Sequence, residues 1–479
     1  MKLTTTAPAF CNESTNLGPY LKSLVHSVRS LGEDRFLSVT HEIGYIDPLA
    51  ILENSNQSNQ PICYLERPAN EFSIACSEFL SKAEFEGNNR FDKAKSWSQE
   101  FFSKCYLVGE HKQPGTGPTM FLTATFESDR ESAECPPSLQ IFLPRWQVIR
   151  KGGQHFLVSN FRISPQSSAQ DIENDLRTRI DAISKMRLAS AITALPEKVS
   201  VENSSEKFCY ESAVELALKE IKTGNISKVV LARQLTYLTD QSIHPFCTAH
   251  LLRERFPDCF TFCITSSNSE IMVGSTPETL LRFSGKIIET EAVAGSAPRG
   301  PSAGKDAHWG KTLLARDKEV HEHRVVIDSI LRRLNSIGLD NCHEGKPRLL
   351  RLANLQHVRT PIRVSCSPKV HPFDALNALH PTPAMGGSPR EIALPLIRKL
   401  EKAPRGLYSG VVGWFDNRGR GEFVVPIRCG KISQNKLTLY AGAGVVSGSN
   451  PSQEKTETDW KLKAMLDVIT GKSDFSSFK

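Results

Sequence analysis

The pattern of hydrophobic and polar positions changes character near residue 200. Before that point, short apolar runs rich in β-branched and aromatic residues are separated by Gly, Pro and Asn clusters, which is typical of strands and turns. These runs are RFLSVTHEI, PICYLE, TMFLTATF, LQIFLPRWQVIRKG and QHFLVSNF. The sequence therefore predicts a strand-rich region over residues 1–200. We find no catalytic constellation in it and interpret it mainly as scaffold.

Beyond this region the hydrophobic spacing becomes helical and then alternates between helix and strand. Apolar residues three and four apart predict helices at 170–194 and 205–223, the second ending at Gly224-Asn225, and the strand KVVLARQLTYL follows. Later patterns predict helices at 247–255, 311–335, 389–402 and 453–470, and strands near 258–265, 270–274, 280–284, 348–356, 409–415, 422–430 and 436–440. Strands on both sides of residue 200 leave no clean boundary, so one large body and two α/β domains both remain open.

Composition and charge argue against nucleic-acid binding, membrane insertion and secretion. The 479 residues carry a net charge of +7 from scattered Lys and Arg, without the basic cluster typical of a nucleic-acid interface. No run of about 18 apolar residues predicts a membrane span, and the N-terminus lacks the apolar core of a secretory signal. Twelve cysteines occur without a CxxC pair. We expect reduced, mostly buried thiols and a cytoplasmic protein.

Two residues are candidates for acid–base chemistry. Lys228 opens the apolar strand KVVLAR, where partial desolvation would make its amine a usable base. Glu278 follows Pro277 in VGSTPETL, where shielding from water would let the carboxyl group hold a proton and act as a general acid. On local sequence alone, a lysine that surfaces at a strand end and a glutamate that stabilises a turn explain the same residues.

Two predicted helices each offer a pair of carboxylates. Glu319 and Glu322 share one helix face, and Glu454 and Glu457 repeat the three-residue spacing, with Lys461 four residues further on. Oxygen ligands of this kind suit Mg²⁺, although ordinary solvated helix faces look similar.

Other segments offer groups that bind anions. Arg428 ends the predicted strand EFVVPIR, and a buried-strand guanidinium is costly unless it meets an anion. The AGAG turn at 441–444 has backbone N–H groups suited to an anion, though close backbone packing explains it as well. His380 in LHPTPAMGG is either structural or able to face a substrate hydroxyl.

The ordered set of these motifs resembles the chorismate-utilising enzymes. It comprises KVVLAR, GSTPE, TEAVAGS, KEVHEH, HPTPAMGG, LYSGVVGW, VVPIR, AGAGVV and the final PxxE..E...K helix. The resemblance covers roughly residues 205–470, and the region around FLPRWQVIRKG resembles menaquinone-type isochorismate synthases more loosely. It implies an α/β (α+β) fold: one large body of two stacked, largely antiparallel sheets with outer helices, as in anthranilate synthase component I. Residues 1–200 would then be the β-rich N-terminal part of this fold, and residues 201–479 the chorismate-binding catalytic region.

The resemblance also implies roles for the candidate residues. Lys228 matches the base that activates water, and Glu278 matches the acid that protonates the departing hydroxyl. Glu322 and Glu457 match the Mg²⁺ ligands, with Glu319 and Glu454 in supporting positions. Arg428 and the segment Gly442, Ala443 and Gly444 match the groups that bind the substrate carboxylates. His380 and Tyr408 match positions that line the pocket, and Lys461 matches a further substrate-binding position. Lys455 departs from the pattern, because relatives often have Trp there.

These matches imply an isochorismate synthase that uses Mg²⁺ and no organic cofactor, acts on chorismate as a monomer or homodimer, and has no nucleic-acid or membrane partner. Aminodeoxychorismate synthases carry a lysine where this chain has Ala294, and anthranilate synthases usually differ at HPTPA and carry a tryptophan site that we do not find here. The motifs HPTPAMGG and TEAVAGS do not separate isochorismate synthase from salicylate synthase, which remains an alternative. The long β-rich N-terminal region favours the menaquinone-type isochorismate synthase. A non-catalytic chorismate-binding subunit is disfavoured because Lys228, Glu278, Glu322 and Glu457 are all present.

Overall fold

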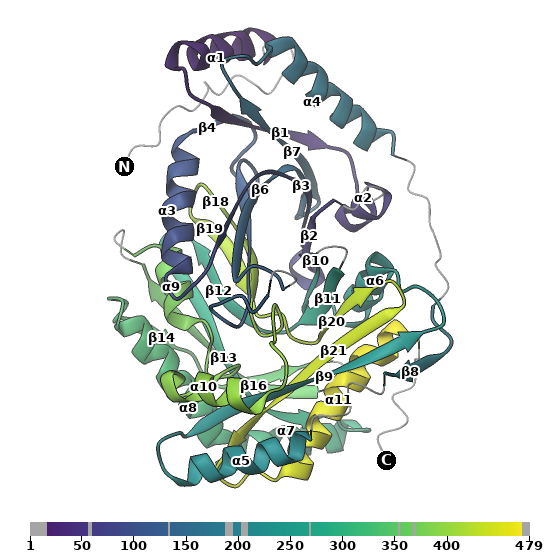
Figure 1. Ribbon diagram of the computed structural model, residues 1–479, viewed down its shortest axis with the longest axis vertical. Helices are drawn as coiled ribbons and strands as arrows, with labels where there is room; N and C mark the ends of the chain where they lie inside the picture. The colour runs from purple at the N-terminus through teal and green to yellow at the C-terminus, as the bar shows by residue number, and fades with distance from the viewer. Residues whose placement is uncertain are drawn as a thin grey trace.

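The computed structural model describes residues 17–55, 60–132, 135–186, 195–202, 209–267, 270–352, 355–366 and 370–471. Figure 1 shows a body of strands surrounded by helices, with the N-terminal elements at one end and the C-terminal helix at the other. The end of the helix predicted at 170–194 and the start of the one at 205–223 lie outside the described residues.

The described strands form one continuous hydrogen-bonded network. They are β1 (Arg35–Ile43), β2 (Ile62–Arg67), β3 (Phe72–Phe85), β4 (Cys105–Gly109), β5 (Thr119–Ala124), β6 (Leu139–Lys151), β7 (Gln154–Ile163), β8 (Val199–Val201), β9 (Lys228–Thr239), β10 (Phe260–Ser267), β11 (Glu270–Thr276), β12 (Thr279–Ser284), β13 (Ile287–Pro298), β14 (Cys342–Glu344), β15 (Arg348–Arg351), β16 (Leu355–Ser365), β17 (Gly387–Ser388), β18 (Val411–Asp416), β19 (Arg420–Val424), β20 (Cys429–Ser433) and β21 (Lys436–Val446). Among them only β1 and β4 pair in parallel.

Long strand β6 is the branch point of the network, because it pairs with β3, β5 and β7. One branch continues from β3 through β2, β10, β11, β20 and β21 to β9, and the other from β5 through β18, β19, β12 and β13 to β16. Side chains of both branches meet in one buried cluster that includes Phe142, Phe262 and Trp414. The expected two stacked, largely antiparallel layers are therefore confirmed, joined through β6.

Strands from before and after residue 200 are hydrogen-bonded to each other. β2 pairs with β10, and β5 pairs with β18 over Val411↔Ala124 to Asp416↔Thr119. Both pairings place N-terminal strands inside the same layers as C-terminal strands. One large α+β body, not two separate α/β domains, is the architecture.

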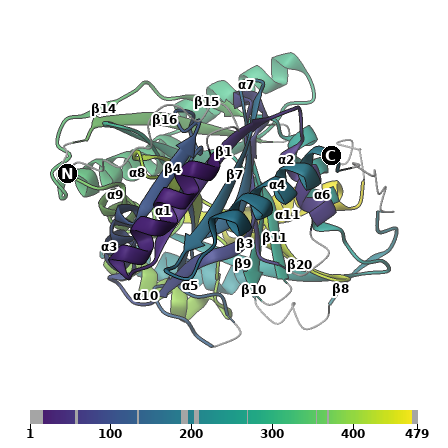
Figure 2. The same ribbon diagram turned by 90° about the horizontal axis from the view of Figure 1, so that it is seen from above.

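Helices cover the outside of the strands. They are α1 (Leu17–Leu31), α2 (Pro48–Ser55), α3 (Arg90–Ser103), α4 (Ala169–Ser184), α5 (Tyr210–Lys222), α6 (Pro245–Arg255), α7 (Ala303–Ala315), α8 (Asp317–Asn335), α9 (Pro372–Leu379), α10 (Arg390–Leu400) and α11 (Pro451–Ile469). Helices α1 and α4 lie together at one end over β1 and β7, as Figures 1 and 2 show. None of the described helices is long and apolar enough to cross a membrane.

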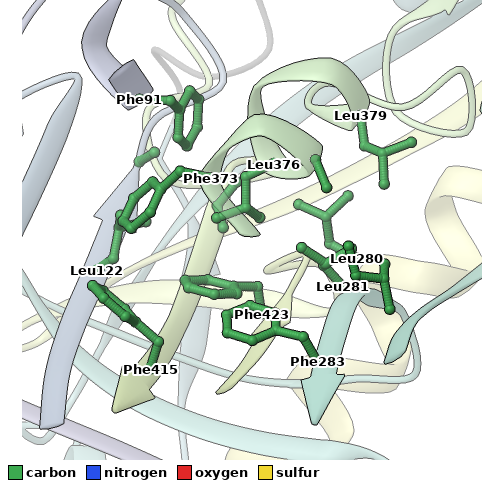
Figure 3. Close-up of a cluster of buried hydrophobic side chains, with 14 of the residues drawn as sticks. Phe91, Leu122, Leu280, Leu281, Phe283, Phe373, Leu376, Leu379, Phe415 and Phe423 are labelled. Carbon is green, nitrogen blue, oxygen red and sulfur yellow. The ribbon is translucent and has the colours of Figure 1, made fainter. Parts of the chain in front are cut away.

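The largest core cluster lies where α3 and α9 cover β12, β18 and β19. Phe373 and Leu376 of α9 point toward Phe415, Phe423 and their neighbours, as Figure 3 shows. Each of these four side chains is at most 3% exposed, and burial of such a side chain contributes roughly 1.5–3 kcal/mol. This packing fixes the sheet that carries Glu278 to the helices behind it.

Three predicted elements have different boundaries in the structure. The predicted helix 311–335 is two helices, because Arg316 is extended (φ −71°, ψ 130°) and separates α7 from α8. The predicted strand 348–356 is likewise two strands, β15 and β16, and β16 continues to Ser365. The predicted strand 422–430 is interrupted between Val424 and Cys429. Pro426 lies in this interruption and has no N–H to give to a ladder.

Candidate active site

A cavity of about 90 Å³ collects residues from segments far apart in the sequence. Its wall is formed by β9, β13, β16, β21, α8, α11 and the turn between β11 and β12. The lining residues are Lys228, Val230, Pro277, Glu278, Val293, Ala294, Gly295, Ser296, Glu322, His357, Ala384, Met385, Tyr408, Ile427, Arg428, Tyr440, Ala441, Gly442, Gly444, Glu457 and Lys461. Nine of the thirteen residues predicted for the site are among them: Lys228, Glu278, Tyr408, Arg428, Gly442, Gly444, Lys461, Glu322 and Glu457.

Lys228 is buried at the first position of β9, with 1% of its surface exposed. Its Nζ donates a hydrogen bond to Glu322 Oε1 on α8 at 2.8 Å. A glycine on the neighbouring strand makes room for this pair. A Cβ at Gly444 would lie 2.8 Å from Glu322 Oε1 and 3.1 Å from Lys228 Cε. The AGAG motif thus serves close packing of β21 against the charged pair.

Glu278 lies between β11 and β12, where both of its backbone groups are hydrogen-bonded. Its N–H donates to Thr276 Oγ1 at 3.2 Å, and its carbonyl accepts from the Val425 N–H at 3.1 Å. The side chain is buried, and that burial, with repulsion from Glu291, raises the pKa of Glu278 to about 8 against the opposing effect of Lys228 and Lys461. The carboxyl group therefore holds a proton at neutral pH, as a general acid requires.

Glu457 and Lys461 lie on successive turns of α11 and form an ion pair that lines the cavity. Lys461 Nζ donates to Glu457 Oε1 at 2.6 Å and to the carbonyl oxygen of Gly442 at 2.8 Å. Burial alone would raise the pKa of Glu457, but Lys461 and Arg428 outweigh it and hold the pKa below its ordinary value. Glu457 is therefore an anionic oxygen donor at neutral pH.

Arg428 reaches the cavity from the interruption between β19 and β20, not from a strand end as predicted. Its backbone φ of 50° is left-handed, which is uncommon for a residue with a Cβ. Gly274, which pairs with the next residue, Cys429, has no space for a Cβ because the Arg428 carbonyl oxygen would lie 2.7 Å away. This sharp turn aims the guanidinium into the same space as Glu278 and Lys228.

His357 is the site residue that the sequence interpretation missed. It lies on β16 directly opposite Ser296, beside the irregularity in the β13–β16 pairing between Ala294 and Ser296. Its Nδ1 is 3.2 Å from the Gly295 carbonyl, and its Nε2 is 3.4 Å from Arg428 Nη2. A carbonyl only accepts and a guanidinium only donates, so Nδ1 carries the proton. Burial, with Arg428 and Lys461 nearby, lowers the pKa of His357 to about 3, so the imidazole is neutral.

The other four predicted site residues do not line this cavity. His380 donates from Nε2 to the Thr125 carbonyl at 3.2 Å and lines a different, larger cavity. Ala443 points to the opposite face of β21 from Gly442 and Gly444, as strand alternation requires. Glu319 and Glu454 are 9% and 3% exposed and lie behind the wall.

The carboxylates of the site provide the oxygen ligands that Mg²⁺ prefers. Glu322 and Glu457 face the cavity, and Glu319 Oε2 is buried without a hydrogen-bond partner among the described residues. Within the described ranges, no three His, Cys, Asp or Glu side chains are already gathered as a ligand set. Glu322 and Glu457 instead hold Lys228 and Lys461. The donor types fit the ion, and one oxygen of each carboxylate is engaged by a lysine.

Comparison with known proteins defines the family. A family model described as chorismate binding enzyme matches residues 23–470, and the chain belongs to this family. The resemblance that the motifs indicated is therefore confirmed.

Individual proteins of this family are similar over large parts of the chain. The salicylate biosynthesis isochorismate synthase of Pseudomonas aeruginosa is 36% identical over 452 residues, covering 93% of this chain and 92% of that protein. The isochorismate synthase EntC of Escherichia coli is 35% identical over 264 residues, which are 55% of this chain and 68% of that protein. The solved structure of MenF, the menaquinone-specific isochorismate synthase from Escherichia coli, has a TM-score of 0.75 at 24% identity, covering 95% of this chain and all of that chain. The last likeness confirms the fold.

Proposed function

We propose that this protein is an isochorismate synthase. The observation that carries the proposal is that a carboxyl group protonated at neutral pH, Glu278, and a buried lysine, Lys228, line one cavity with Arg428. An acid and a base facing one anionic substrate suit the exchange of one hydroxyl for another on the chorismate ring. The names of the full-length and partial relatives support the same reaction.

In the proposed mechanism each residue has one task. Once its amine is neutral, Lys228 takes a proton from a water molecule, whose oxygen attacks C2 of chorismate. The ring double bonds shift as the hydroxyl at C4 departs, and Glu278 gives that hydroxyl its proton so that it leaves as water. Arg428, with its fork of N–H donors, holds a substrate carboxylate. One water enters and one leaves, so the product is an isomer of the substrate.

We propose Mg²⁺ as the metal, held by Glu322 and Glu457 with Glu319 and Glu454 in support. When bound, it supplies positive charge for the ring carboxylate and stabilises charge that develops there. The orphaned Glu319 Oε2 and the anionic Glu457 support this assignment. His357 keeps its proton on Nδ1, and its Nε2 accepts from Arg428 Nη2 and so orients the guanidinium.

We further propose that residues 201–479 carry the chemistry and that residues 1–200 complete the scaffold. Every lining residue of the cavity is numbered 228 or higher, which supports this division. The described cysteines are free thiols, which supports a cytoplasmic location. We expect a monomer or homodimer.

The test is product analysis after incubation of the purified protein with chorismate and Mg²⁺, without ammonia or glutamine. An isomer of unchanged mass and new chromatographic retention, lost on addition of a chelator, is the expected result. Pyruvate with salicylate would assign the alternative salicylate synthase reaction instead. Conversion only after ammonia is supplied would contradict water as the nucleophile and indicate an amine-transferring enzyme.

A further inference from the structure

A second and larger cavity, of about 780 Å³, shares no lining residue with the candidate active site. It lies among the start of α3, the segment after β5, the end of α9 and helix α10. Its volume is within the range of sites that enclose small organic ligands. Neither the proposed reaction nor its residues account for it.

Arginine side chains without carboxylate partners surround the inner end of this cavity. Arg90 Nη2 donates to the Thr125 carbonyl at 3.0 Å, and Arg390 Nη2 donates to the Ala378 carbonyl at 2.7 Å. Arg333, packed behind the wall, donates to the Pro381 carbonyl at 2.7 Å. Among the described residues, none of the three has an acidic oxygen within ion-pair distance. Arg90 is 4% exposed and also lies over the Phe91 ring, whereas Arg333 and Arg390 are partly exposed. A cation drawn out of water without an acidic partner is costly, and an anion would reduce that cost.

Arg390 also has a donor to spare. Its Nε is buried and has no hydrogen-bond partner in the described part of the chain. Burial lowers the pKa of Arg90 and of Arg390 to about 10, so both guanidinium groups remain charged at neutral pH. His380 lies near both and is neutral, because burial and these arginines lower its pKa, and its Nε2–H donates a hydrogen bond to the Thr125 carbonyl.

Acidic residues also line the cavity, but they are either satisfied or exposed. Glu127 accepts from the N–H groups of Arg405 and Gly406 at 2.8 and 3.1 Å, and Glu401 binds the Arg405 guanidinium. Glu131 and Glu391 are exposed, where solvent screens their charge. Arg398 and Lys402, which also line the cavity, are exposed and screened in the same way, so the positive charge without an acidic partner lies at Arg90 and Arg390. This combination favours an anion with a single charge.

The walls next to the cations are apolar and aromatic. Phe91 is 3% and Phe126 6% exposed, and Leu394 on α10 is partly buried beside them. Phe91 belongs to the core cluster under α9, as Figure 3 shows, so its ring is held in place from behind. Arg90 lies over the Phe91 ring and Arg405 over the Phe126 ring, so one face of each ring is already covered. A planar ligand would meet the ring edges or the other faces.

We propose that this cavity is a binding site for a small organic acid with one negative charge and a planar apolar body. The carboxylate meets the Arg390 and Arg90 side chains at the inner end, and the planar body lies against Phe91 and Phe126. The site is separate from the proposed reaction, since no residue serves both cavities.

Isothermal titration calorimetry on the full chain tests the proposal, with 1-naphthoate as probe and 1-naphthamide as its uncharged match. One molecule of naphthoate is expected to bind, at least tenfold more tightly than the amide. Leu394→Trp enlarges the side chain beside Phe126, where the planar body is proposed to lie, and removes no hydrogen bond. It should weaken the binding of both naphthoate and naphthamide, whereas Arg390→Gln should weaken the binding of naphthoate only. Arg428→Gln alters only the first cavity and should leave binding unchanged.

Three results would overturn the proposal: no saturable binding of naphthoate, equal binding of acid and amide, or binding that Arg428→Gln weakens and Leu394→Trp does not. Thermal unfolding of each variant checks that it is folded. If Leu394→Trp does not fold, Arg390→Gln decides through the ratio of acid to amide affinity. These outcomes do not depend on turnover of chorismate, so failure here leaves the proposed function untouched.

Discussion

The Nζ atom of Lys228 lies 2.8 Å from Oε1 of Glu322, so the residue proposed as base is held by a residue proposed as metal ligand. Both are recessed in the same wall, and Gly444 leaves the space in which they meet. An oxygen that binds the ion cannot keep the same contact with Lys228. Occupation of the metal site is therefore expected to change how Lys228 is held.

Replacing Lys228 by Ala should lower kcat by about 10²–10⁴, the usual contribution of a general base. Lys228→Arg is the matched control, because arginine keeps the positive charge but does not give up its proton. Both variants should lose kcat to this extent yet still bind substrate, which measurements of kcat and of substrate Kd would show. Activity in Lys228→Arg would show that the site needs only the charge.

Removal of metal should abolish turnover and lower thermal stability. Mg²⁺ that binds only the folded protein stabilises it by RT ln(1 + [L]/Kd), which is about 2.7 kcal/mol at a hundredfold excess over Kd. Thermal unfolding with and without EDTA measures this shift in Tm. Glu457→Gln should lose the Mg²⁺-dependent shift, whereas Glu131→Gln, on the exposed rim of the second cavity, should keep it. A shift that survives in Glu457→Gln would remove Glu457 from the ligand set.

The acid role of Glu278 predicts a specific pH profile. With its pKa at about 8, Glu278 carries the required proton below that pH and loses it above. kcat/KM should therefore fall about tenfold per pH unit above pH 8. Glu278→Gln should lower kcat by about 10²–10⁴ and leave no such limb in its residual activity. A wild-type profile that stays flat to pH 9.5 would contradict the assignment.

The same raised pKa has a consequence for stability. Between the ordinary pKa of 4.5 and about 8, the folded state binds a proton at Glu278 that the unfolded state has released. The stability that this group contributes is thus present at low pH and is lost as the pH rises through that window. The free energy of unfolding falls by at most about 1.4 kcal/mol per pH unit. Glu278→Gln should become progressively more stable than wild type from pH 5 to pH 8 in urea unfolding.

Gly444→Ala should inactivate the enzyme while it remains folded. The new Cβ would lie 2.8 Å from Glu322 Oε1 and 3.1 Å from Lys228 Cε, so the ion pair must separate. Overpacking of this kind costs about 1–3 kcal/mol of stability. Gly304→Ala is the control, because no atom lies within 4 Å of its added Cβ. Turnover and Tm of the two variants, measured side by side, separate the local effect from a general one.

Arg405→Met should destabilise the fold by about 3–5 kcal/mol, since it leaves the buried Glu401 carboxylate unpaired. Arg405 is 3% exposed and also donates to the carbonyl oxygens of Met385 and Val230, both 2.8 Å away. It therefore joins the walls of the two cavities. Adding Glu401→Gln should recover part of the loss. Urea unfolding of the single and double variants measures the coupling, and strict additivity would contradict it.

Much of the candidate site was predictable because its chemistry is carried by short motifs on regular elements. Lys228, Glu322 and Glu457 begin or occupy periodic segments, so their elements follow from local hydrophobic spacing. His357 did not follow, because it lies just beyond the strand predicted at 348–356, and only the pairing of β16 with β13 places the imidazole opposite Ser296. His380, directly before Pro381, gave the stronger local signal but belongs to another cavity.

Interruptions within predicted helices and strands were the other source of error. The hydrophobic pattern passes through Arg316 without change, yet one extended residue there turns α8 away from α7 and orients Glu322. The same holds at Arg428, whose left-handed backbone has no signature in an apolar run. Backbone dihedrals at single residues are set by tertiary contacts, which a local pattern does not contain.

The pairing of β9 with β21 has a consequence for the order of events during synthesis. Val446↔Lys228 at one end and Lys436↔Leu238 at the other join segments separated by some two hundred residues. A ribosome that adds roughly 5–20 residues per second leaves the first of these strands waiting for its neighbour for ten seconds or more. During that interval Lys228 and its apolar strand have an open edge, and chaperone occupancy of nascent chains should be greatest in this window.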